Sequence, residues 1–221
     1  MSLIGKVVLI TGASSGIGAA TAIHFSQLGA QLSLTGRNIQ NLQNTVDRCK
    51  GPKPFFIIGE LTNESDAKNI LNSTIEHYGK LDVLVNNAGI LEIGSIENTS
   101  LEQFDNVNGI RSFPNVLAYC MSKSAVDQFT RCVALELAEK QVRVNSVNPG
   151  VTETNLHKTS GMQEKQLEEF FERGKSTHPL GRVGDVAEVA KTIAFLASDD
   201  ASFITGATLP VDGGRHALCP R

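Results

Sequence analysis

Tyr119 and Lys123, four positions apart in the stretch AYCMSKSAVDQF, are a pair with the potential for proton transfer. The surrounding pattern predicts a helix, in which positions i and i+4 share one face. A lysine ammonium near a phenol favours the phenolate and lowers the phenol pKa from about 10. A tyrosine in that setting can exchange a proton with a carbonyl or alcohol oxygen. The spacing alone is also typical of a surface pair on an amphipathic helix.

A glycine-rich segment near the N-terminus, TGASSGIG over residues 11–18, indicates nucleotide binding. It follows the apolar run KVVLI and precedes a helical pattern. In that context glycines let the backbone approach a pyrophosphate, and the helix N-terminus favours the negative charge. The alternative is an ordinary glycine-rich turn between a strand and a helix.

The second predicted strand ends in Thr35-Gly36-Arg37-Asn38, which bears on the choice of cofactor. A carboxylate at this point would suit the ribose hydroxyls of NAD(H). A guanidinium suits a 2′-phosphate instead, so Arg37 favours NADP(H) over NAD(H). The alternative is a solvated arginine at the start of a helix.

The tetrapeptide Asn86-Asn87-Ala88-Gly89 ends the fourth predicted strand. Small residues there would let the backbone pass close to a ribose, and asparagine side chains can tie neighbouring loops together. Taken alone, the tetrapeptide is a turn signal.

The elements that must position these residues follow from the pattern of apolar residues. Strands are predicted in KVVLITG, AQLSLTG, PFFIIG, LDVLVNNAG, VRVNSVNPG and ATLPVDGG. Helices are predicted over residues 17–29, 39–49, 64–78, 119–140 and 186–197, with Asn63 as an N-cap and Gly29 as a helix end. This alternation predicts one α/β domain over residues 1–221, a doubly wound parallel sheet covered by helices on both faces.

Composition excludes several other classes of protein. A net charge of −3 and a pI near 6.0 argue against a nucleic-acid or membrane-surface binder. The four cysteines lie far apart and the five histidines lack metal-ligand spacing, so we expect reduced thiols and no metal site. The N-terminal residues do not have the pattern of a signal peptide, and a cytoplasmic protein is expected.

In order along the chain, TGxxxGxG, NNAG, YxxxK and Pro149-Gly150 resemble the motifs of the short-chain dehydrogenase/reductase family. The C-terminal part, from HPLGRVGD to LPVDGG, is similar to that of 3-oxoacyl-carrier-protein-reductase-like and glucose-dehydrogenase-like members. The resemblance implies a Rossmann-like fold. It also implies an NAD(P)(H)-dependent oxidoreductase that interconverts a carbonyl and a secondary alcohol of a small-molecule substrate by hydride transfer.

The resemblance also assigns roles to residues by motif. It implies that Tyr119 is the catalytic acid/base, with Lys123 lowering its pKa and anchoring the ribose. The implied cofactor-binding residues are Gly12, Ser14, Gly16, Ile17, Gly18 and Arg37 at the phosphates and adenosine, Glu60 and Leu61 at the adenine, Asn87, Ala88 and Gly89 at the ribose, and Pro149, Gly150, Val151 and Thr154 at the nicotinamide carboxamide. The family usually has Asp-Val where this chain has Glu60-Leu61.

The interval from Gly89 to Tyr119 is shorter than the family pattern requires. It is a step of 30 positions, and the family places a long helix, a strand and the approach to the tyrosine helix there. A parallel crossover alone needs about a dozen residues or more. The sequence EIGSIENTSLEQFDN runs directly into VNGIRSFPNVLAY without a β-branched apolar run. We therefore expect an internal deletion, with the joint near residues 105–114, that truncates one helix and the central strand.

The deletion bears on activity and on assembly. The family serine that contacts the substrate carbonyl falls at Asn106 here, and Asn108 and Ser112 are not at the required offset. The resemblance therefore implies an oxidoreductase with impaired or lost activity. Two alternatives remain: a catalytically inactive nucleotide-binding protein, or a poorly folded product of a splice form or gene model. The lost helix normally forms part of a subunit interface, so a homo-oligomer is expected to be weakened.

Overall fold

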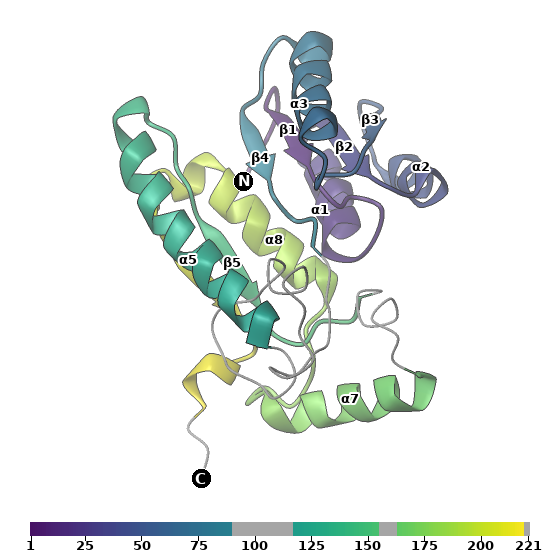
Figure 1. Cartoon of the computed structure of the whole chain (residues 1–221), viewed down its shortest axis with the longest axis vertical. Coiled ribbons are helices and arrows are strands. Elements are labelled where there is room, and N and C mark those ends of the chain that lie inside the picture. The colour runs from purple at the N-terminus through teal and green to yellow at the C-terminus, as the bar shows by residue number, and fades with distance from the viewer. Residues whose placement is uncertain (90–116, 155–162, 219–221) are drawn as a thin grey trace. The chain divides into compact units, whose positions relative to one another are not determined.

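Alternating strands and helices form the chain, and a computed structural model describes residues 1–89, 117–154 and 163–218 (Figure 1). The described residues belong to two units. Unit 1 comprises residues 1–89 and 185–201, and unit 2 comprises the described residues within 117–184 and 202–218. A single domain over residues 1–221 stays a prediction.

Unit 1 is built on a four-stranded parallel sheet in the order β3-β2-β1-β4. The strands are β1 (Val7–Ile10), β2 (Gln31–Gly36), β3 (Phe55–Ile58) and β4 (Val83–Val85). Its helices are α1 (Gly16–Gln27), α2 (Ile39–Arg48), α3 (Glu64–Tyr78) and α8 (Val186–Ala197), with a short 3-10 helix at Asp199–Ala201. The predicted Rossmann-like parallel α/β fold is confirmed.

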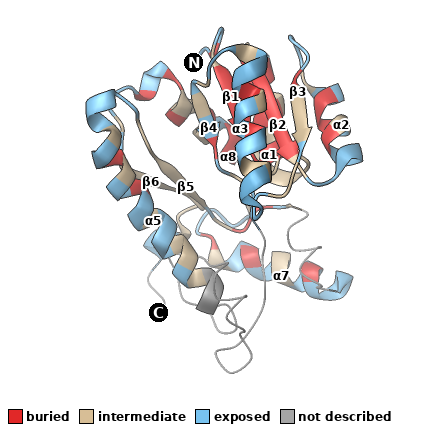
Figure 2. Cartoon of the chain, turned by 45° about the horizontal axis from the view of Figure 1, so that its top comes forward, coloured by how far each residue is buried: buried red, intermediate tan, exposed pale blue. Residues whose placement is uncertain are grey.

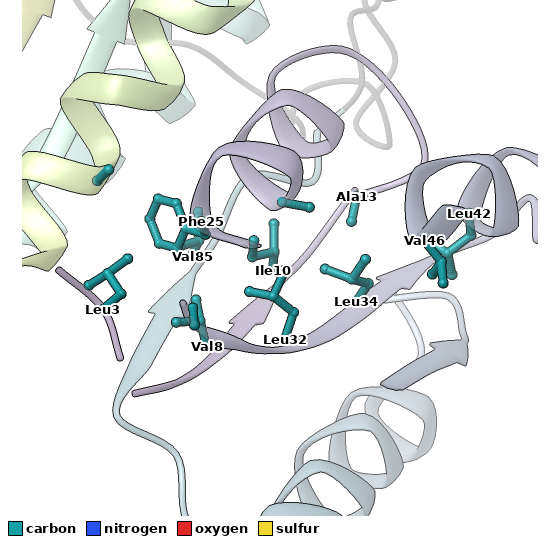
Figure 3. Close-up of a cluster of buried hydrophobic side chains, with 13 residues drawn as sticks. Leu3, Val8, Ile10, Ala13, Phe25, Leu32, Leu34, Leu42, Val46 and Val85 are labelled. Carbon is teal, nitrogen blue, oxygen red and sulfur yellow. The ribbon is translucent and has the colours of Figure 1, made fainter. Parts of the chain in front are cut away.

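Residues on β2 alternate between the two faces of the sheet, and this alternation explains the helical layers. Leu32 and Leu34 are buried in an apolar cluster with residues of α1, α2 and α8 (Figure 3). Ser33 faces the opposite way, where its hydroxyl lies 2.7 Å from that of Thr74 on α3. The central strands of the sheet are therefore buried, while the outward helix faces are exposed (Figure 2).

Local signals set the helix ends in unit 1. The helices α3 and α8 begin and end at the predicted residues. The Asn63 side chain accepts a hydrogen bond from the Ser65 N–H at 2.9 Å, so the predicted N-cap is confirmed. Gly29 follows α1 with a φ of +85°, a conformation that favours glycine and ends the helix.

Unit 2 combines a two-stranded parallel sheet with helices. Its strands are β5 (Ser146–Pro149) and β6 (Thr208–Val211), and its helices are α5 (Leu117–Leu137) and α7 (Glu164–Thr177), with 3-10 helices at Ala138–Lys140 and Arg215–Ala217. The helix α5 packs against β5. No helix in the described part of the chain has the length and apolar character needed to cross a membrane.

The strands β4 and β5 are shorter than the sequence predicted. The pairing of β4 with β1 stops at Val85, because the next residues turn toward Thr11. Before β5, Val144 and Asn145 bond to the turn at residues 204–207 instead of continuing the ladder. Strand β4 therefore stops, and strand β5 starts, where hydrogen bonds of side chains take over from the regular bonds between strands.

The strand β4 lies at the edge of its sheet in the part of the chain that is described. It pairs with β1, while β5 pairs with β6 in a separate sheet. Leu84 on β4 is 50% exposed. A strand in the middle of a parallel sheet would be covered on both faces and paired on both edges.

Candidate functional site

The glycine-rich loop joins β1 to α1, and two of its glycines have no room for a side chain. A Cβ on Gly18 would lie 2.4 Å from the Gly12 carbonyl oxygen and 2.5 Å from Nδ2 of Asn87. Gly12 has a φ of +64°, and a Cβ there would lie 2.8 Å from Cα of Ala88. The loop therefore requires glycine at both positions because other backbone segments approach it closely.

Thr11 ties this loop to the segment that follows β4. Its hydroxyl oxygen accepts hydrogen bonds from the backbone N–H of Asn87 at 2.9 Å and of Ala88 at 3.0 Å. The hydroxyl lies 3.3 Å from the Val85 carbonyl, to which it donates. Thr11 is buried, and its bonds to the two N–H groups are partly buried. We call this set of contacts, together with those of Asn87 described next, the loop junction.

The Asn87 side chain makes the reciprocal contacts of the loop junction. Its Nδ2 donates to the carbonyl oxygens of Thr11 at 2.9 Å and Gly12 at 3.3 Å. The expectation that an asparagine of this tetrapeptide ties neighbouring loops together is confirmed. Sequence analysis did not find the part played by the Thr11 hydroxyl.

The N-terminus of α1 follows the loop and has the features of an anion site. Gly16 begins the helix with a φ of +55°. Ser15 precedes it with extended backbone, and its side chain does not cap the helix. The first turn of α1 holds no acidic residue. The first backbone N–H groups of a helix lack partners within the helix and attract anions, so this end of α1 fits a phosphate.

The loop also contacts the end of β2, next to Arg37. The Ala13 N–H donates to the Thr35 carbonyl at 2.9 Å. A Cβ on Gly36 would lie 3.1 Å from the Ser14 hydroxyl oxygen. The arginine that was predicted to recognise a 2′-phosphate therefore follows directly on the segment of β2 to which the glycine-rich loop is bonded.

Arg37 forms an ion pair that sequence analysis missed. Its Nη1 donates to Oε2 of Glu60 at 3.1 Å. This hydrogen bond lowers the pKa of the Glu60 carboxyl below its ordinary value. The signal was available in the sequence, because Arg37 and Glu60 follow neighbouring parallel strands whose carboxyl ends meet at one edge. Leu61, the next predicted adenine contact, is 37% exposed.

In unit 2, α5 carries the predicted catalytic pair. Tyr119 and Lys123 are four residues apart on this helix, and the Tyr119 side chain lies outside the described residues. Lys123 is half-buried. Burial lowers the pKa of Lys123, and the charge of Asp127 opposes this shift. Burial raises the pKa of Asp127, opposed by Arg131, by Asn148 and by Lys123.

Asp127 also links α5 to β5. Nδ2 of Asn148 donates to its Oδ1 at 3.4 Å, a long hydrogen bond. Asn148 immediately precedes Pro149, the first residue of the segment predicted to hold the nicotinamide carboxamide. The helix with the catalytic pair and this segment are therefore joined through one carboxylate.

The Pro149-Gly150-Val151 segment is held by His178, which sequence analysis did not single out. The Val151 N–H donates to Nε2 of His178 at 3.1 Å, and Nδ1 lies 2.6 Å from the Gly174 carbonyl. An N–H can only donate, so Nε2 accepts and Nδ1 carries the hydrogen. A Cβ on Gly150 would lie 2.6 Å from Nε2, so glycine is required there. No local pattern marks this role, because the contact joins residues 27 positions apart.

Three further sets of residues bear on the predicted site: Thr154, the aromatic residues of the amphipathic stretch MQEKQLEEFFERGK, and the positions near the joint. Thr154 is half-buried, two residues beyond the bridge from Thr152 to Gly184. Phe170 and Phe171 on α7 form an edge-to-face pair with centroids 5.7 Å apart, and both are half-buried. Their role as pocket-lining or packing residues stays open. Asn106, at the position of the family serine, and the nearby Asn108 and Ser112 lie outside the described residues.

The loop junction, the uncapped N-terminus of α1 and the parallel sheet define a dinucleotide-binding α/β protein. The family model for short chain dehydrogenases matches residues 6–111, and the model described as enoyl-(acyl carrier protein) reductase matches residues 106–216. The chain belongs to the short-chain dehydrogenase/reductase family, whose members are oxidoreductases.

Individual relatives support this assignment. A 3-oxoacyl-(acyl-carrier-protein) reductase of Thermotoga maritima is 36% identical over 251 positions, covering 97% of this chain and 99% of the relative. A short-chain dehydrogenase/reductase of Mycobacterium marinum superposes with a TM-score of 0.89 at 30% identity, covering 99% of this chain and 98% of that one. A 3-ketoacyl-(acyl-carrier-protein) reductase of Brucella melitensis, complexed with NADH, superposes with a TM-score of 0.85 at 30% identity. The match covers 97% of this chain and 100% of that one.

The length of the Thermotoga alignment bears on the short interval before Tyr119. It spans 251 positions, whereas this chain has 221 residues, so at least 30 aligned positions have no residue of this chain. The two family models overlap at residues 106–111, where the match to one model ends and the match to the other begins. That segment lies inside the joint predicted at residues 105–114.

Proposed function

We propose that this chain is an NADP(H)-preferring oxidoreductase that interconverts a carbonyl and a secondary alcohol, with turnover reduced by an internal deletion. The observation that carries the proposal is the anchoring of the glycine-rich loop. The loop junction ties it to the segment after β4, and the Ala13 N–H bonds it to the Thr35 carbonyl near the end of β2, close to Arg37. Neither Gly12 nor Gly18 has room for a Cβ, because the loop packs against itself and against the segment after β4, and this packing fixes the backbone that leads into the N-terminus of α1.

The proposed mechanism assigns cofactor-binding roles to residues by their motifs. Bound nicotinamide cofactor supplies or accepts the hydride. The first N–H groups of α1 bind the pyrophosphate, and Arg37 binds the 2′-phosphate. The segment at Gly150 and Val151, which His178 holds in place, binds the carboxamide.

Tyr119 and Lys123 are assigned the proton transfer. Tyr119 exchanges a proton with the substrate oxygen, and the Lys123 ammonium stabilises the phenolate form. The position of the family serine is occupied by Asn106, so one donor to the substrate carbonyl is missing. Loss of one donor of this kind typically lowers the rate by about 10²–10³. We therefore expect reduced turnover.

The second candidate function is a nucleotide-binding protein without turnover. It is favoured by the contrast between unit 1, whose predicted binding residues are present, and the shortened interval before Tyr119. Unit 1 keeps the loop junction and Arg37, whereas at least 30 aligned positions are absent from the chain and the family models change over at residues 106–111. An internal deletion accounts for both findings, and we propose it on that basis.

Cofactor binding tests the proposal first. Saturating NADPH is expected to raise the midpoint of thermal unfolding, because a ligand of the native state contributes about 2.7 kcal/mol at 100 times its Kd. NADH at the same concentration is expected to give a smaller rise. Arg37→Ala should abolish the larger shift given by NADPH, whereas Arg48→Ala, which removes an exposed charge on α2, should leave the difference unchanged. Unchanged selectivity in Arg37→Ala would refute the assignment of Arg37.

Turnover separates the two candidate functions. Tyr119→Phe is expected to lower NADPH-dependent carbonyl reduction by about 10²–10⁴ while NADPH binding is retained, because the phenol alone exchanges the proton. Steady-state absorbance at 340 nm measures the rate. Tyr78→Phe is the control: that hydroxyl bonds the Leu32 carbonyl at 2.9 Å, so its loss should affect stability and not turnover. NADPH binding without turnover in the unmutated chain would favour the non-catalytic protein.

A further inference from the structure

The ion pair between Arg37 and Glu60 lies at the place where cofactor selectivity is proposed to arise. Nη1 of Arg37 is 3.1 Å from Oε2 of Glu60, and both side chains reach solvent, with 67% and 42% of their surfaces exposed. The pair therefore forms at the surface, where a ligand can reach the guanidinium.

The backbone on both sides of the pair is fixed. The Glu60 N–H donates to Oδ2 of Asp66 at 2.9 Å, which holds Glu60 at the start of the segment leading to α3. The Gly59 N–H donates to the Gly36 carbonyl at 3.4 Å, so the segments that carry Arg37 and Glu60 are bonded one residue before the pair. The carboxylate is thus presented to Arg37 by the ends of two neighbouring strands.

A carboxylate and a phosphate compete for the same donors of an arginine. The guanidinium has five N–H donors in one plane, and oxyanions bind it in the same geometry. Hydrogen bonding from Arg37 lowers the pKa of Glu60, so the carboxylate is ionised at neutral pH. A 2′-phosphate carries about −1.5 to −2 charges near pH 7. Its approach to Arg37 therefore meets both a competitor for the donors and a like charge.

We propose that Glu60 is a specificity-determining residue that limits the preference for NADP(H), by occupying Arg37 and repelling the 2′-phosphate. The inference rests on the proposed cofactor site in unit 1. NAD(H) has hydroxyls where NADP(H) has the phosphate, so it neither needs Arg37 nor meets the repulsion. The carboxylate of Glu60 therefore weakens NADPH binding selectively and brings the two affinities closer together.

The test compares the Kd of NADPH and NADH by calorimetric titration of the whole chain. Glu60→Gln keeps the size of the side chain and removes its charge. It is expected to raise the ratio of the NADH Kd to the NADPH Kd by about three- to tenfold, as for one screened charge near the surface. The ratio cancels any contact of Glu60 with the adenine, which both cofactors share.

Two further variants isolate the mechanism. Glu64→Gln removes an equal charge from an exposed pair with Lys68 at the start of α3, and should leave the ratio unchanged. In an Arg37→Ala background, Glu60→Gln should change the ratio by less than in the unmutated chain, because the competition for the guanidinium is gone.

The outcomes separate this inference from the proposed function. An unchanged ratio in Glu60→Gln, with NADPH still bound, overturns the inference alone. Weaker NADPH binding in Glu60→Gln also overturns it, and would mean that Glu60 orients Arg37 for the phosphate. Failure of the unmutated chain to bind either cofactor overturns the proposed function and the inference with it.

Discussion

Replacement of Gly18 by valine is expected to abolish cofactor binding and to lower the free energy of unfolding by about 2–4 kcal/mol, as for overpacking at a closely packed site. The first side-chain atom alone would lie 2.4 Å from the Gly12 carbonyl oxygen and 2.5 Å from Nδ2 of Asn87. Both neighbours belong to the loop junction, so they cannot move without breaking hydrogen bonds. The loop must shift, and with it the backbone that would approach the pyrophosphate.

Chemical denaturation followed by circular dichroism measures the loss of stability, and calorimetric titration with NADPH measures binding. Gly89→Ala is the control for stability, because a Cβ at Gly89 meets no atom of the described residues within 4 Å. Its free energy of unfolding should change by less than about 0.5 kcal/mol. A Gly18→Val chain that binds NADPH with unchanged affinity would show that the loop is not the phosphate site.

Replacement of Thr11 by valine is expected to lower the free energy of unfolding by about 2–4 kcal/mol. Valine preserves the shape but removes the hydroxyl that accepts from the N–H groups of Asn87 and Ala88. A fully buried donor left without an acceptor costs about 1–3 kcal/mol, and here two partly buried donors lose their acceptor together. The glycine-rich loop loses its attachment to the end of β4, so NADPH affinity should fall as well.

Thr11→Ser separates the hydroxyl from the rest of the side chain. Serine keeps the acceptor and removes one methyl group, so stability should fall by only about 1 kcal/mol and NADPH binding should be retained. The same denaturation and titration measurements apply. Equal loss in the serine and valine variants would mean that packing of the methyl group, and not the loop junction, accounts for the effect.

Much of the fold was predictable because its signals are local. The apolar periodicity gave the extents of α3 and α8, and Asn63 and Gly29 marked helix ends through their own side-chain and backbone preferences. The strands β4 and β5 were overestimated. Their ends depend on where partner strands stop and where Thr205 and Asn145 replace ladder bonds, which no local pattern records.

The candidate site was predictable only in part. The motifs identified Gly12, Gly18 and Arg37, because glycine spacing and residue type reflect the shape and charge of a phosphate site. The partners of these residues were missed. Asn87 and Thr11 are 76 positions apart, and Glu60 and Arg37 are 23 apart. His178 was set aside as one of five scattered histidines, yet it is buried against Gly150 and bonded to Val151.

The sequence by itself determined the order of strands and helices, the family, and the residue types available for binding a nucleotide. Helix and strand propensity and the periodicity of apolar residues depend on residues close together in the chain, and motifs indicate the chemistry that a site requires. Only the tertiary structure decided which groups meet: Thr11 with the segment after β4, Arg37 with the Glu60 carboxylate, and Val151 with His178. These contacts join residues far apart in the chain, and they arise from the packing of parallel strands and the turns that follow them.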